Sequence, residues 1–197
     1  MRSRIAVLAS GGGSNLQAIL EHFDRLGERR GGDVVVVASG RPDSGALDRA
    51  RGRGLPIESI ATKTRPGLLV DDLVERYEVD LIVLAGYLQM VPESVVSRFP
   101  GRIINVHPAL LPAFGGAGMY GERVHQAVLD AGARVTGVTV HFVDHIYDSG
   151  PIIAQWPVPV FPNDDAKTLA ARVLRVEHLV YPRVVDAVAG GRTTLSN

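Results

Sequence analysis

Short runs of aliphatic and β-branched residues alternate along this chain with segments of helical periodicity. After the run at 5–9 and a glycine-rich turn, apolar residues recur at helical spacing: Leu16, Ile19, Leu20 and Phe23. Further strands are expected at 34–38, 56–60, 81–85 and 103–106, and helices at 46–53, 68–77 and 92–99. Alternation of this kind builds right-handed β–α–β units. The expected fold is therefore α/β: a doubly wound, Rossmann-like, mostly parallel sheet flanked by helices.

The C-terminal half has a different pattern. Residues 109–121 form a long loop rich in Gly and Pro, and loops of this length are often functional. A helix is expected at 124–131, and strands at 136–143 and 152–158 are joined by a turn at 148–151, which adds an antiparallel element. A long helix at 169–188 contains Pro182, which we expect to kink or divide it. We expect one domain over residues 1–197, with a loosely ordered tail at 190–197.

Amino-acid composition excludes several classes of protein. Of the 197 residues, 46% are hydrophobic and 21% are charged, as in ordinary soluble globular proteins. Lys plus Arg and Asp plus Glu both number 21, so the basic excess typical of nucleic-acid binding is absent. The lack of Cys excludes disulfides, zinc thiolates and a cysteine nucleophile. No apolar run reaches the ~18 residues of a membrane span. We expect a cytoplasmic protein that binds neither nucleic acid nor a membrane.

The turn after the first strand contains three glycines at 11–13, followed by Ser14 and Asn15. Backbone N–H groups at a helix N-terminus attract phosphate, and glycines let it approach closely. The dinucleotide fingerprint needs Gly at position 16, where Leu16 stands, and the Walker pattern needs a Lys that is missing. Two interpretations are equally open: a site for a phosphate monoester, and a tight β–α turn capped by Ser14 or Asn15.

Asn105 and His107 lie at the end of an expected buried strand, two residues apart and hence on one side of it. Ligands of open α/β sheets bind beyond the carboxyl ends of the strands. There an amide can donate to a developing oxyanion and an imidazole can exchange a proton near neutral pH. Asp148 lies in a strong turn signal, where it either stabilises its own turn or faces His107 and raises the imidazole pKa.

Metal binding is not expected. His141 and His145 are four residues apart, a metal-ligand spacing on a helix, but here they straddle the end of an expected strand. A serine hydrolase is also not expected, because the chain has no Gly-x-Ser-x-Gly elbow.

Five motifs together resemble the folate-dependent phosphoribosylglycinamide formyltransferase family. They are Ser-Gly-Gly-Gly-Ser-Asn-Leu-Gln at 10–17, Leu-Ala-Gly-Tyr-Leu at 84–88, Ile-Asn-Val-His-Pro-Ala-Leu-Leu-Pro at 104–112, Gly-Val-Thr-Val-His-Phe-Val-Asp at 137–144 and Asp-Ser-Gly-Pro at 148–151. The resemblance extends from residue 5 to about 190. It implies transfer of a formyl group from 10-formyltetrahydrofolate, a co-substrate, to the amine of glycinamide ribonucleotide, by a monomer or homodimer.

The same resemblance implies roles for individual residues. The catalytic residues would be Asn105, His107 and Asp148. The ribonucleotide would be bound by Gly13, Ser14, Asn15 and Glu177. The folate would be bound by Arg65, Leu88, Gln89, Met90, Val91, Asn105, Asp144, His145, Ile146, Tyr147 and Asp148.

The chain departs from the family pattern in three places. Gln89 stands where the family often has Arg, Pro66 follows Arg65 in a segment that is shorter than usual, and the loop at 114–121 is a variant.

Three alternatives remain. A 10-formyltetrahydrofolate hydrolase would replace the amine by water, but related hydrolases carry an N-terminal regulatory domain, whereas this chain starts at the expected first strand. Transformylases of initiator tRNA or amino sugars carry C-terminal additions. A catalytically silent nucleotide-binding module would not need Asn105, His107 and Asp148 together.

Overall fold

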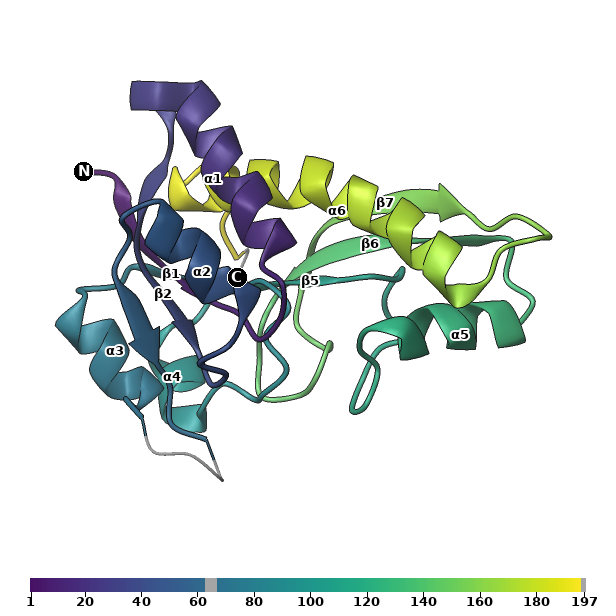
Figure 1. The fold of residues 1–197 in the computed structure, drawn as a ribbon, viewed down its shortest axis with the longest axis horizontal. Helices are drawn as coiled ribbons and strands as arrows, with labels where there is room; N and C mark the ends of the chain where they lie inside the picture. Colours follow the sequence, from purple (N-terminus) through teal and green to yellow (C-terminus); the bar gives the residue numbers. More distant parts are fainter. Residues whose placement is uncertain (63–66, 196–197) are drawn as a thin grey trace.

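The computed structural model describes residues 1–62 and 67–195. In these ranges the chain forms a seven-stranded sheet flanked by helices (Figure 1). In chain order the elements are β1 (Ser3–Leu8), α1 (Ser14–Leu26), the 3-10 helix η1 (Gly27–Arg29), β2 (Gly32–Ser39), α2 (Gly45–Gly52), β3 (Ile57–Ser59), α3 (Val70–Arg76), β4 (Leu81–Leu84), α4 (Glu93–Arg98), β5 (Ile103–His107), α5 (Glu122–Asp130), β6 (Val135–Phe142), β7 (Ile152–Pro159) and α6 (Ala166–Ala189).

The sheet has the strand order β3-β2-β1-β4-β5-β6-β7. The pairs from β3 to β5 are parallel, whereas β5–β6 and β6–β7 are antiparallel. The expected doubly wound, mostly parallel fold with an antiparallel C-terminal part is therefore confirmed. The strand order reverses between β1 and β4, since β1 lies between β2 on one side and β4 on the other.

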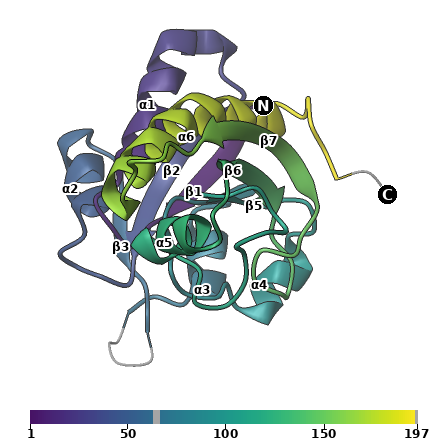
Figure 2. The ribbon, with the colours of Figure 1, turned by 90° about the vertical axis from the view of Figure 1, so that its right-hand side faces the viewer.

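Strand alternation builds a separate core on each face of the sheet. Ile5 and Val7 of β1 pack in the cluster that includes α1, α2 and α6, while Ala6 and Leu8 pack in the cluster of α3 and α4. Figure 2 shows α1 and α6 on one side of the sheet and α3 and α4 on the other. Strands covered on both faces read as continuous apolar runs, which is why the sequence revealed them.

The prediction that Pro182 divides the last helix is wrong. Helix α6 is continuous from Ala166 to Ala189, with Pro182 inside it. Buried residues on both sides of the proline, Val173 before it and Val185 after it, belong to the same core cluster. Packing of both halves against one surface offsets the hydrogen bond that proline cannot donate. At the other end, Asp165 and Thr168 form a capping box.

None of the described helices is long and apolar enough to cross a membrane.

Candidate active site

The candidate site is a cavity of about 750 Å³ at the carboxyl ends of the central strands. This volume lies within the range of small-molecule sites. Residues that follow β1, β4 and β5 all line it, including Asn15, Gly86 and Pro108. The cavity thus lies where the strand order reverses, the position at which open α/β sheets bind ligands.

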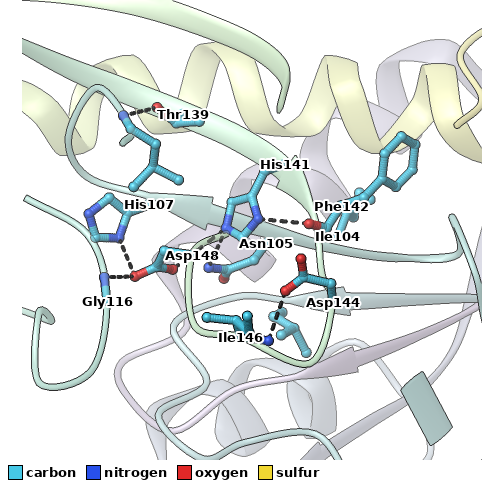
Figure 3. Close-up of polar contacts among 12 residues, drawn as sticks. Ile104, Asn105, His107, Gly116, Thr139, His141, Phe142, Asp144, Ile146 and Asp148 are labelled. Carbon is cyan, nitrogen blue, oxygen red and sulfur yellow. Dashed lines mark hydrogen bonds and ion pairs between the residues drawn. The ribbon is translucent and has the colours of Figure 1, made fainter. Parts of the chain in front are cut away.

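Asn105, His107 and Asp148 meet on one wall of this cavity (Figure 3). Asn105 and His107 are on β5, and Asp148 comes from the segment between β6 and β7. His107 is 3% exposed, and its Nδ1 lies 3.5 Å from Asp148 Oδ2. The sequence had placed Asp148 in a turn, and the structure brings it to His107 across 41 residues of chain because β6 returns antiparallel to β5.

The loop between β5 and α5 holds both members of this pair through its backbone. The carbonyl oxygen of Phe114 accepts a hydrogen bond from His107 Nε2 at 2.8 Å. The Gly116 N–H donates to Asp148 Oδ2 at 2.9 Å. Phe114 and Asp148 both have positive φ, 57° and 55°, a backbone region that costs energy for residues other than Gly. The strain is located at the two residues that contact His107, Phe114 through its carbonyl oxygen and Asp148 through its carboxylate.

These contacts fix the tautomer of His107. A carbonyl only accepts hydrogen bonds, so Nε2 carries the proton of the neutral ring and Nδ1 carries the lone pair. Proton uptake then occurs at Nδ1, where the Asp148 carboxylate stabilises the resulting imidazolium.

Asp148 faces His107 and raises the imidazole pKa, as one of the two interpretations of its turn expected, but burial has the larger effect. Burial lowers the pKa of His107, and the Asp148 carboxylate and the Phe114 carbonyl raise it by less, so the net direction is downward. For Asp148, burial raises the pKa, but contacts with His141, Gly116 and His107 outweigh burial and lower it overall. At neutral pH the pair is thus a neutral imidazole facing a carboxylate, ready to accept a proton.

His141 is a site residue that the sequence analysis set aside. It is 2% exposed and lies directly opposite Asn105 in the β5–β6 register. Its Nδ1 donates to the carbonyl of Phe142 at 2.8 Å, so Nε2 accepts from Asn105 Nδ2 at 3.2 Å. This contact orients the amide of Asn105, and its second N–H has no hydrogen-bond partner among the described residues and can donate to a ligand. Its Nε2 also lies 3.6 Å from Asp148 Oδ1.

The end of the cavity near β1 is formed by two buried polar side chains. Asn15 and Glu177 are each 8% exposed, and Asn15 Nδ2 donates to Glu177 Oε2 at 2.6 Å. Burial raises the pKa of Glu177, and the Asn15 hydrogen bond lowers it by less. Asn15 Oδ1 is buried without a hydrogen-bond partner among the described residues. Tyr181 secures this part of α6, because its hydroxyl donates to the carbonyls of Leu84 and Ile104.

Most of the glycine-rich turn lies outside the lining of the large cavity. Neither Gly13 nor Ser14 is among the residues lining the large cavity, and Ser14 lines a second one of about 440 Å³. Gly13 has φ 75°, and a Cβ there would lie 2.5 Å from Ala46 Cα. The turn therefore needs glycine for its own conformation and for the close approach of α2.

The opposite side of the cavity is largely apolar. It is lined by the residues expected to bind folate: Leu88, Gln89, Met90, Val91, Asp144, Ile146, Tyr147 and Asp148. Leu88, Met90 and Ile146 are at least half exposed, at 50%, 52% and 67%, so they present apolar surface that a ligand in the cavity could cover. His145 is exposed and does not line the cavity. Arg65 lies outside the described residues.

A family model for formyl transferases matches residues 3–185. The chain belongs to the formyl transferase family. Within it, the chain is similar to the chloroplastic phosphoribosylglycinamide formyltransferases of Arabidopsis thaliana and Vigna unguiculata, with 45% and 46% identity over 97% of this chain. The resemblance predicted from the motifs is thus confirmed.

Comparison with solved structures agrees with this family assignment. Glycinamide ribonucleotide transformylase 1 from Symbiobacterium toebii has 40% identity and a TM-score of 0.89, with 100% of this chain and 92% of that chain covered. A formyltetrahydrofolate deformylase from Pseudomonas syringae has a TM-score of 0.88 at 23% identity, covering 100% of this chain and 64% of that one, a likeness of fold alone. The chain spans 67% and 62% of the two plant relatives and 19% of the trifunctional purine biosynthetic protein of Bos taurus, which is 36% identical.

Proposed function

We propose that residues 1–197 act as one formyltransferase domain that moves the formyl group of 10-formyltetrahydrofolate to the amine of glycinamide ribonucleotide. The products are formylglycinamide ribonucleotide and tetrahydrofolate. The observation that carries this proposal is that Asn105, His107 and Asp148 meet (Figure 3) on the wall of a cavity with two unlike groups of lining residues. One group includes the apolar side chains of Leu88, Met90 and Ile146, which suit a folate ring system, and the other includes the buried pair Asn15 and Glu177.

The chemistry follows from the contacts of each group. The amine nitrogen forms a bond to the formyl carbon, and the carbonyl oxygen becomes an oxyanion that the free N–H of Asn105 stabilises. His107 Nδ1 accepts the proton that the amine loses and passes it to the folate nitrogen as the carbon–nitrogen bond breaks. The nearby Asp148 carboxylate stabilises the imidazolium between these two steps.

For the ribonucleotide we propose that the turn at Gly13, Ser14 and Asn15 binds the phosphate and that Glu177 binds the sugar. Backbone N–H groups at the start of α1 are suited to a phosphate, and no side chain caps that helix end. For the folate we propose Arg65, the segment 88–91, Asp144 and the segment 146–148, without His145, which does not line the cavity. With Gln89 in place of an arginine, charge recognition of an acidic folate tail would not come from this position.

The test uses the purified chain with 10-formyltetrahydrofolate, with and without glycinamide ribonucleotide. Release of tetrahydrofolate only in the presence of the ribonucleotide, with equimolar formylated product, is the expected result. Tetrahydrofolate released at the same rate without the amine would identify a hydrolase. Binding of both ligands with neither product would identify a silent binding module.

A further inference from the structure

His125 is a buried polar residue of the catalytic cavity that the proposed chemistry leaves without a role. It lies on α5, is 5% exposed and lines the large cavity. Its Nδ1 is sealed from solvent and has no hydrogen-bond partner among the described residues. A buried polar atom without a partner reduces stability. The fold retains a group here that a leucine would replace more favourably if packing were its only role.

The surroundings determine which ring atom can act. Because Nδ1 is sealed, the cavity meets the ring through its other edge, which carries Nε2. An unpaired N–H is rarer in protein interiors than an unpaired acceptor, so Nδ1 holds the lone pair and Nε2 holds the proton. Burial lowers the pKa of His125, a proton on the nearby His107 lowers it further, and Glu122 only partly opposes them. The ring is a neutral N–H donor at neutral pH.

The position of His125 assigns it to the amine substrate rather than to the folate. The segments expected to bind folate follow β4 and β6, whereas His125 is on α5, which packs on α6. The wall of α6 that lines the cavity runs from Lys167 through Leu174 to Glu177, and Glu177 contacts the glycine-rich turn through Asn15. The α5–α6 wall is therefore continuous with the acceptor end of the cavity.

We propose that His125 is a specificity-determining residue for the amine substrate, with Nε2–H donating a hydrogen bond to a neutral oxygen, a hydroxyl or carbonyl, of its ribosyl-glycinamide part. This inference rests on the proposed function. A neutral hydrogen bond contributes modestly, so its loss corresponds to a change of about 3- to 10-fold in affinity.

The test compares His125→Leu, which removes the donor, with His125→Gln, whose amide nitrogen reaches the position of Nε2. We expect His125→Leu to raise the KM of glycinamide ribonucleotide about 3- to 10-fold, with kcat and the folate KM within twofold of wild type. His125→Gln restores most of the affinity. The Tm of His125→Leu is not lower than that of wild type, because the variant removes a buried atom without a partner. An unchanged amine KM, or a fall in Tm with no change in KM, would show a structural residue and overturn the proposal.

Two further arms complete the design. If the oxygen is a hydroxyl, an analogue lacking the ribose hydroxyls loses more affinity for wild type than for His125→Leu, because Glu177 is present in both proteins. An equal loss for the two proteins assigns the glycinamide carbonyl. Calorimetric titration of glycinamide ribonucleotide into wild type separates this proposal from the proposed function. If glycinamide ribonucleotide binds to wild type and more weakly to His125→Leu, but no formyl group is transferred, the role of His125 is supported and the proposed activity is refuted. If it does not bind to wild type, both proposals are refuted.

Discussion

Gly115→Ala tests whether the backbone of the β5–α5 loop positions the proposed catalytic pair, His107 and Asp148. Gly115 lies between Phe114, whose carbonyl accepts from His107, and Gly116, whose N–H donates to Asp148. Its φ is not positive, so alanine adds no left-handed strain. The new Cβ would lie 3.2 Å from Asp148 Cβ and well inside van der Waals contact with Leu111 Cδ2.

The size of the effect follows from these distances. Carbon atoms pack at about 3.5–4.0 Å, so either the end of the Leu111 side chain or the loop must move by about 1 Å. Where the loop moves, the 2.9 Å hydrogen bond from Gly116 exceeds hydrogen-bond length, and a misplacement of ~1 Å can cost ~10² in rate. Overpacking costs about 1–3 kcal/mol. At roughly 2–4 °C per kcal/mol for a chain of this size, the expected loss in Tm is about 2–12 °C.

Steady-state kinetics with both substrates and a thermal melt measure this outcome. We expect kcat to fall between 10- and 100-fold, with the KM of each substrate within a few-fold of wild type. The control is the pair Leu111→Val and Leu111→Val/Gly115→Ala, because valine lacks the Cδ2 atom that alanine would meet. Part of the lost kcat should return in this background. A Gly115→Ala variant with a lowered Tm and a kcat within threefold of wild type would refute the positioning role.

Three further predictions concern the catalytic pair and the turn. His107→Ala should fold and lose at least ~10² in kcat; near-wild-type turnover by a folded variant would remove His107 from the chemistry. Asp148→Asn should shift the His107 limb of the pH–rate profile to lower pH, because the carboxylate raises the His107 pKa against burial; an unmoved limb would restrict Asp148 to its turn. Gly13→Val should lower Tm and raise the ribonucleotide KM, because the valine side chain would meet Ala46 and φ at this position is 75°. The control Gly12→Ala, whose Cβ has no atom within 4 Å, should leave Tm unchanged. Equal Tm values for the two variants would contradict this reasoning.

Much of the fold could be predicted because short stretches of sequence determine which residues form strands and helices. Runs such as 34–38 and 81–85 are apolar throughout, since strands covered on both faces have no polar side, and they form β2 and β4. Pro182 shows the limit of local reasoning. A proline inside a helix is unfavourable by itself, and only the common core on both sides of it keeps α6 continuous.

The candidate site could be predicted in part for the same reason. Asn105 and His107 lie on one strand, and their spacing alone puts them on one side. His141 was missed because its importance depends on pairing: it faces Asn105 only when β6 lies antiparallel to β5. Had the strand at 136–143 been paired with the one at 103–106 in that register, the Asn105–His141 contact would have followed. His125 left no signal beyond a polar residue among the apolar positions of α5.

The net pKa of His107 could not be predicted either, because it depends on how two opposing effects compare. A neighbouring carboxylate follows from a motif, whereas the degree of burial follows only from the packed structure. At 3% exposure, burial has the larger effect on the His107 pKa. In the proposed mechanism the resting His107 ring is therefore a base that becomes an acid during turnover, rather than an acid from the start.

The loop at 114–121 explains how a variant sequence can hold the proposed catalytic pair, His107 and Asp148, in place. Its two contacts to His107 and Asp148 come from a carbonyl and an N–H, groups that nearly every residue carries. No side-chain motif can reveal such contacts, and substitutions in the loop need not disturb them. The structure instead constrains the shape of the loop: Phe114 has a positive φ, and a Cβ at position 115 would closely approach Leu111 and Asp148. We therefore expect Gly115 to tolerate substitution less well than loop positions that act only through a backbone group.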